Sequence, residues 1–61
     1  MKYACENKNI LPMIDLAEKH IPGSAVYSYG QNTRINTPVE IPQKTLEIFK
    51  QKGYDLEPVT N

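Results

Sequence analysis

The sequence is poor in the residues that form covalent or metal cross-links, with one cysteine, Cys5, and one histidine, His20. A single cysteine excludes an intramolecular disulfide and a cysteine-rich zinc site, and it is typical of a reducing compartment. Asp15 and Glu18, the acidic residues nearest to His20, do not complete the ligand spacing of a metal site. We therefore expect a protein that uses neither a metal nor a cofactor.

The chain also lacks an excess of charge, because seven basic side chains balance seven acidic ones. Nucleic-acid-binding proteins usually carry a basic excess, since contacts with phosphate supply most of their affinity. No apolar run approaches the roughly 18 residues of a membrane span, and the opening segment MKYACENKN has no apolar signal core. We expect a cytoplasmic protein without membrane contact, and lysine in place of arginine with frequent Asn and Ile favours a bacterial or phage origin.

The most strongly patterned stretch is Thr37–Gly53 (TPVEIPQKTLEIFKQKG), which predicts an amphipathic helix over residues 42–52. Pro42 suits the first helical position, where its missing N–H would have no partner. Gly53 suits the left-handed residue that follows a helix. Steps of about 100° per residue gather the large apolar side chains on one side: Leu46, Ile48 and Phe49. A helix this short is marginal alone, so we expect that side to pack on the core.

The remaining chain divides into short elements at its prolines and glycines. Side-chain patterns predict strands over residues 1–5, 25–29, 33–37 and 54–59, and a helix over residues 12–20. In that helix, Asp15 in the first turn and Lys19 near the end complement the helix dipole. Ile21-Pro22-Gly23-Ser24 is typical of a type II turn, and Gly30-Gln31-Asn32 of a short hairpin connection. Pro58 confines the last strand to an edge or ends it.

This order, β-α-β-β-α-β, predicts a single compact domain of the small α+β class over residues 1–61. We expect a two-layer sandwich in which both helices cover one face of a small antiparallel sheet. If all four strands form, the arrangement is the split β-α-β, ferredoxin-like one. The core of so short a chain must be thin, so self-association as a homodimer is a reasonable expectation.

Tyr27 and Tyr29, together with Arg34, form the group whose pattern best suits binding. Alternation along a strand puts both rings on one sheet face, and Arg34 belongs to the facing strand. Aromatic rings beside an arginine can contact a protein partner or stack nucleic-acid bases. Alternatively, the tyrosines pack under the helices with their hydroxyl groups at the rim. The small size of Val26 and Ser28 on the opposite face slightly favours this alternative, because they cannot form a core alone.

The sequence shows no catalytic constellation. Cys5 could act as a nucleophile only beside a base, and we interpret it as a small buried apolar residue. We expect His20 to be a partly buried structural residue or a partner of the helix dipole. Gly23-Ser24 lacks the glycines of a nucleophile elbow, and the three glycines are too scattered to cradle a phosphate. An enzyme whose site forms between subunits and includes His20 or Cys5 is the less favoured alternative.

These observations predict a small cytoplasmic protein that binds another protein, as its inhibitor or regulator, and that is not an enzyme. The candidate surface combines the tyrosine pair and its arginine with the exposed side of the 42–52 helix. Its residues are Tyr27, Tyr29, Arg34, Lys44, Glu47 and Lys50. The alternative is a module that binds RNA or another single-stranded nucleic acid through the tyrosine-bearing face.

Overall fold

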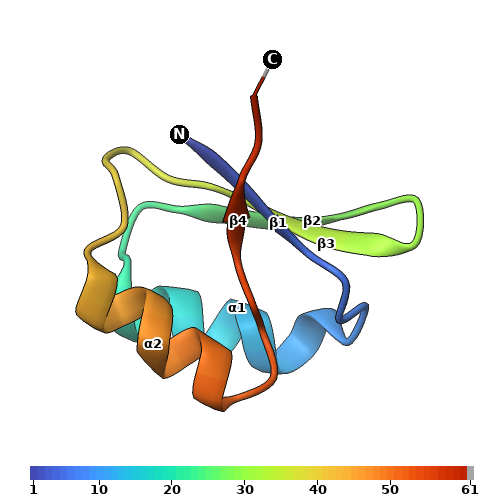
Figure 1. Cartoon of the computed structure of the whole chain (residues 1–61), viewed down its shortest axis with the longest axis horizontal. Helices are drawn as coiled ribbons and strands as arrows, with labels where there is room; N and C mark the ends of the chain where they lie inside the picture. The colour runs from blue at the N-terminus through green and yellow to red at the C-terminus, as the bar shows by residue number, and fades with distance from the viewer. Residues whose placement is uncertain (61) are drawn as a thin grey trace.

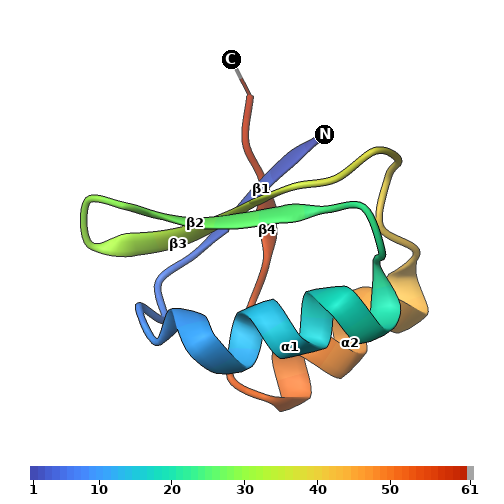
Figure 2. The same ribbon diagram turned by 180° about the vertical axis from the view of Figure 1, so that it is seen from behind.

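The computed structural model describes residues 1–60, which form two helices and a four-stranded sheet. The elements are β1 (Lys2–Cys5), α1 (Ile10–His20), β2 (Ala25–Tyr29), β3 (Asn32–Asn36), α2 (Gln43–Gln51) and β4 (Glu57–Pro58). Figures 1 and 2, which view the molecule from opposite sides, both show α1 and α2 on the same side of the sheet. The predicted two-layer α+β class is confirmed.

The sheet has the order β2-β3-β1-β4, and all neighbouring strands are antiparallel. β3 separates the two strands that α1 connects, and β1 separates the two strands that α2 connects. The predicted first and last strands both form, and the last one is an edge strand of two residues that includes Pro58. Assignment to the ferredoxin-like class stays a prediction.

α1 begins at Ile10, two residues earlier than the sequence pattern predicts. Just before this helix start, the side-chain Oδ1 of Asn7 accepts a hydrogen bond of 3.0 Å from the Asn9 N–H. Pro12 then lies inside the first turn, where it is tolerated because first-turn N–H groups have no intrahelical acceptor. The expected position of Asp15 in the first turn is therefore wrong, while Lys19 lies in the last turn as predicted.

Pro42 precedes α2 as its N-cap instead of occupying the first helical position. Its backbone is extended, with φ −61° and ψ 152°, and its carbonyl accepts a hydrogen bond of 3.0 Å from the Leu46 N–H. A proline fits this position because it needs no N–H donor there. Within residues 1–60, neither helix is long and apolar enough to cross a membrane.

The end of α2 confirms the predicted role of Gly53. Gly53 has a positive φ of 94°, and its N–H donates to the Lys50 carbonyl at 3.0 Å. The next N–H, from Tyr54, donates to the Phe49 carbonyl at 2.8 Å. These two bonds are those of a Schellman motif. The motif turns the chain back toward the core, where Phe49 and Tyr54 are both buried.

The turn at residues 21–24 and the β2–β3 hairpin place the strands that carry the candidate residues. In the first turn, Gly23 has a φ of 86° and the Ser24 N–H donates to the Ile21 carbonyl at 3.3 Å, as in a type II turn. In the hairpin, Tyr29 pairs with Asn32, so the connection has two residues and not the three that the sequence suggested. Gly30, with a φ of 60°, occupies the first of them.

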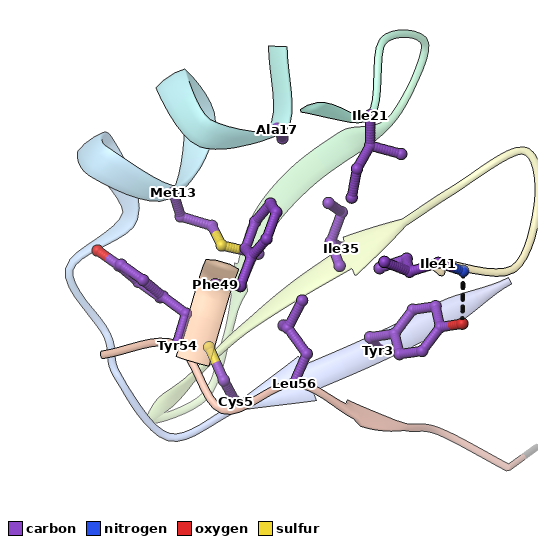
Figure 3. Close-up of a cluster of buried hydrophobic side chains, with 10 residues drawn as sticks. All are labelled: Tyr3, Cys5, Met13, Ala17, Ile21, Ile35, Ile41, Phe49, Tyr54 and Leu56. Atoms are coloured by element: carbon purple, nitrogen blue, oxygen red, sulfur yellow. Dashed lines mark hydrogen bonds between the residues drawn. The ribbon is translucent and has the colours of Figure 1, made fainter. Parts of the chain in front are cut away.

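The core lies between the sheet and the two helices, and Figure 3 shows its side chains gathered between α1 and the strands. It contains residues from the helices, the sheet and three of the connecting segments: Tyr3, Cys5, Met13, Ala17, Ile21, Ile35, Ile41, Phe49, Tyr54 and Leu56. Phe49 at its centre is fully buried. The tail alternates as predicted, because Leu56 points into the core while Asp55 is exposed.

Candidate functional site

Tyr27 and Tyr29 lie on the sheet face that points away from the helices. In the antiparallel pair, Val26 is directly opposite Ile35, which is fully buried under the helices. Tyr27 is opposite Arg34. Directly opposite residues share a face and successive residues alternate, so the two tyrosines and Arg34 occupy the other face. The alternative in which the tyrosines pack under the helices is therefore wrong.

Small residues suffice on the helix side of β2 because side chains of α1 fill the space there. Met13 and Ala17 of α1 are buried in the core, and Leu16 packs against it. Val26 also packs against that cluster as a partly buried residue. A strand next to a helix that presents large side chains can thus contribute a small side chain such as Val26 and still help to enclose a core.

We call the helix-free side of the sheet the open face. By alternation and register it carries Lys2, Ala4, Ala25, Tyr27, Tyr29, Asn32, Arg34, Asn36 and Glu57. The sequence pattern indicated Tyr27, Tyr29 and Arg34 among these residues, but not the other six. The signal that could have found Asn32 and Asn36 is their two-residue spacing from Arg34, which a strand period of two places on the same face.

Arg34 is stacked on the ring of Tyr29. Its Cζ lies 3.8 Å from the ring centroid, in a cation–π geometry that contributes about 0.5–1 kcal/mol at exposed sites. The Tyr29 side of the pair remains 56% exposed. The Nε atom of Arg34 is buried and has no hydrogen-bond acceptor among residues 1–60. The stack therefore holds an aromatic ring and a guanidinium group in a fixed arrangement on the surface.

Lys44, Glu47 and Lys50 lie on a different surface from the tyrosines. All three are exposed, and Phe49 on the same helix is fully buried toward the sheet. The exposed side of α2 thus points away from the sheet, whereas the open face is on the side of the sheet that carries no helix (Figures 1 and 2). The six candidate residues form two surfaces on opposite sides of the molecule.

Cys5 is buried, as the sequence predicts. It is 5% exposed, and its Sγ contacts the Asn7 carbonyl oxygen at 3.8 Å. Burial raises the pKa of the Cys5 thiol above its ordinary value, and the nearby Asp55 raises it further. Reactive cysteines have the opposite property, a lowered pKa. Cys5 is therefore a structural residue in this fold.

His20 and Cys5 lie at opposite ends of α1. Cys5 contacts Asn7, just before the helix begins, while His20 is its last residue. Eleven helical residues span about 15 Å along the axis. His20 is half-buried and its ring meets Phe49 edge-on, with centroids 6.3 Å apart and an interplanar angle of 66°. The expected structural role of His20 agrees with this contact.

A depression of about 500 Å³ lies at the end of β1 beside β4. Its lining includes Cys5 and the carboxylates of Glu6, Asp55 and Glu57. Over the part of the chain that the structure describes, no three side chains of His, Cys, Asp or Glu are grouped as metal ligands would be. Of these acidic residues, Asp55 raises the pKa of the Cys5 thiol, which disfavours the thiolate.

No protein-family model, no curated protein and no solved structure matches this chain. A fold alone does not define a function. The chemistry and geometry of the open face are therefore what bears on the function of this protein.

Proposed function

We propose that this protein binds another protein through the open face and acts as its regulator or inhibitor. The observation that carries the proposal is the Tyr29–Arg34 stack beside Tyr27, on a sheet face that no helix of residues 1–60 covers. Tyrosine and arginine are among the residue types that are enriched where binding energy concentrates in protein interfaces. A ring that is already held in place also loses less conformational entropy when a partner binds.

The open face indicates the chemistry of the partner surface. The two tyrosine rings offer apolar contact, and the planar guanidinium of Arg34 offers donors that match a carboxylate. We infer that the partner presents an apolar patch next to an aspartate or glutamate.

The proposal is tested by comparing variants on the two sides of the molecule. Tyr29→Ala and Arg34→Ala should each weaken binding to a partner identified by affinity capture by about tenfold or more, because truncating a dominant contact costs about 2 kcal/mol. Lys44→Ala and Lys50→Ala, on the exposed side of α2, are the matched controls and should change the dissociation constant by less than about twofold. Isothermal titration calorimetry gives both values. Equal effects from the two sides, or wild-type binding by the open-face variants, would refute the proposal.

A second candidate is a module that binds RNA or another single-stranded nucleic acid through the same face. Tyrosine rings and an arginine on an uncovered sheet are suited to base stacking. Two observations make it weaker: the chain has no net charge, and the central strands β1 and β3 carry no aromatic residue on the open face. A salt-dependent mobility shift of single-stranded RNA that is lost in Tyr27→Ala would favour this candidate. Unchanged mobility at low salt would exclude it.

The proposal includes a cytoplasmic location and a bacterial or phage origin, which the free cysteine and the lysine-rich composition favour. That the protein is not an enzyme stays a prediction. It is supported by the raised pKa of the buried Cys5 thiol and by the contact of His20 with Phe49. Unchanged partner binding by a His20→Ala variant would agree with binding as the function.

A further inference from the structure

β2 is the unprotected edge of the sheet. The opposite edge, β4, has only two residues, one of which is Pro58. β2 has five residues, AVYSY, with neither a charge nor a proline. Proteins commonly protect exposed edges with charged side chains, prolines or very short strands, because an edge presents unpaired backbone groups to any other strand. One edge of the sheet is therefore protected against further pairing, and the β2 edge is not.

Backbone hydrogen bonds of Lys2 in β1 and of Met1 just before it show which way successive residues direct their backbone groups. The Thr37 N–H donates to the Met1 carbonyl at 2.7 Å, toward the β3 side. The Val59 N–H donates to the Lys2 carbonyl at 2.9 Å, toward the β4 side. Successive residues of an antiparallel strand thus direct their backbone groups to opposite neighbours, as the ladder pattern requires.

The same alternation, followed from β1 through β3 to β2, identifies the backbone N–H and C=O groups of β2 that do not point toward β3. Ala4 directs its backbone to β4, as Lys2 does, so its opposite residue Arg34 directs its own to β2. Arg34 is opposite Tyr27, which therefore pairs inward. The N–H and C=O groups of Val26 and Ser28 consequently point away from the sheet and have no strand beside them within residues 1–60.

We propose that β2 pairs with β2 of a second copy of this chain, antiparallel about a two-fold axis at Tyr27. In this register Val26 faces Ser28 of the second copy, so every outward backbone group of both residues gains a partner. Tyr27 faces Tyr27 across the axis, and aromatic cross-strand pairs stabilise antiparallel strands. A two-fold axis brings like residues together, and the uncharged β2 allows this without repulsion.

The surface beside β2 also suits this pairing. A groove of about 290 Å³ runs between α1 and the start of β2, and Ile14, Ala17 and Val26 line part of it. The two-fold axis brings this groove next to its copy, so partly exposed apolar side chains such as Ile14 become more buried. The two sheets join into one, with the tyrosines of both copies in a continuous row on the open face. The pairing uses the strand edge, so it does not depend on the protein partner proposed for the open face.

Sedimentation equilibrium tests the pairing. The wild-type protein should sediment with twice the chain mass of 7.0 kDa, and Ser28→Pro should sediment as one chain. Proline removes an N–H that points outward and is compatible with an edge strand, so the β2–β3 pair is expected to remain. Ser28→Ala keeps that N–H and is the matched control, which should remain a dimer. A wild-type monomer at millimolar concentration, or a Ser28→Pro dimer, would overturn the proposal.

Hydrogen exchange in the wild-type protein gives a second test that needs no variant to fold. The Val26 and Ser28 amides should exchange more slowly as the protein concentration rises, because only the dimer protects them. Fast, concentration-independent exchange of both amides would overturn the pairing. Protection that appears only when an extended peptide from another protein is added would also overturn it, and it would assign the edge to a different partner.

Discussion

At the scale of single residues, the four tyrosines divide into two pairs with different roles. Tyr3 and Tyr54 are buried, and their hydroxyl groups bond to the backbone of Ile41 and Asn9. Tyr29 is exposed beneath Arg34. The residue type is the same, but the register of its strand decides whether a tyrosine completes the core or forms a contact surface.

Tyr3→Phe is expected to destabilise the protein by about 1–3 kcal/mol. The Tyr3 hydroxyl accepts a buried hydrogen bond of 3.0 Å from the Ile41 N–H (Figure 3), and removing it leaves that donor unpaired. Tyr29→Phe removes an exposed hydroxyl of the same kind and should change the free energy of unfolding by less than about 0.5 kcal/mol. Urea unfolding measures both values. Equal losses in the two variants would show that the Tyr3–Ile41 bond does not contribute as described.

Alkaline pH is expected to destabilise the protein through Cys5. Burial raises the pKa of its thiol above the ordinary value of 9.0, which the unfolded chain retains. The unfolded state therefore loses its proton first, so the contribution of Cys5 is complete below about pH 9 and is lost as pH rises through the folded-state pKa. Burial raises the pKa of Tyr54 above 10.0 in the same sense.

Unfolding free energies between about pH 7 and pH 10 check this, with Cys5→Ala as the comparison. The variant should show a smaller decline above pH 9, because it keeps the raised pKa of Tyr54 but has no thiol to titrate. Parallel curves for the two proteins would mean that the Cys5 pKa is the same in the folded and unfolded states.

At the scale of elements, the sequence predicted the helix ends better than the helix starts. Gly53 ends α2 as predicted, since a positive φ leaves few alternatives to glycine. The sequence pattern predicts Pro12 and Pro42 at the first position of their helices, but Pro12 lies within the first turn of α1 and Pro42 is the N-cap of α2. Neither the N-cap nor the first helical turn needs an N–H donor. A proline therefore indicates that a helix begins nearby, but not at which residue it begins.

The side of the sheet on which the tyrosines lie could have been predicted from the hairpin. A two-residue connection at Gly30-Gln31 pairs Tyr29 with Asn32 and hence Tyr27 with Arg34. A charged residue opposite Tyr27 then favours the solvent side for both. The three-residue connection that the sequence predicts does not pair Tyr27 with Arg34. Without this pairing, the small size of Val26 favours the wrong face for the tyrosines.

Gly53→Ala is expected to lower the free energy of unfolding by about 1–2 kcal/mol, because a left-handed backbone is strained for alanine. A Cβ at this position would also lie 3.3 Å from the Nδ2 of Asn7. Gly30 also has a positive φ of 60°, but a Cβ there would have no atom within 4 Å. The Gly30→Ala variant therefore measures the backbone strain without a steric contact. Thermal unfolding should rank Gly53→Ala as the more destabilised. A smaller loss at Gly53 than at Gly30 would contradict the described helix end.

At the scale of the whole molecule, the two layers separate the part that holds the fold together from the part that is free to bind. Both helices pack on one face of the sheet, so the core lies between the layers and the open face has only solvent beyond it within residues 1–60 (Figure 1). The sequence showed each candidate residue but not that α2 and the tyrosines lie on opposite sides. That relation depends on how the elements pack in three dimensions, which local patterns do not contain.

The central claim, that the open face is the binding surface, is tested most directly by the rate at which a tyrosine-specific reagent modifies each tyrosine. Peptide mass spectrometry reads the rates in the free protein and in its complex with the partner. We expect Tyr29 to react fastest in the free protein, Tyr3 and Tyr54 to stay protected, and Tyr29 to become protected when the partner saturates the protein. Unchanged labelling of Tyr29 in the saturated complex would contradict the claim.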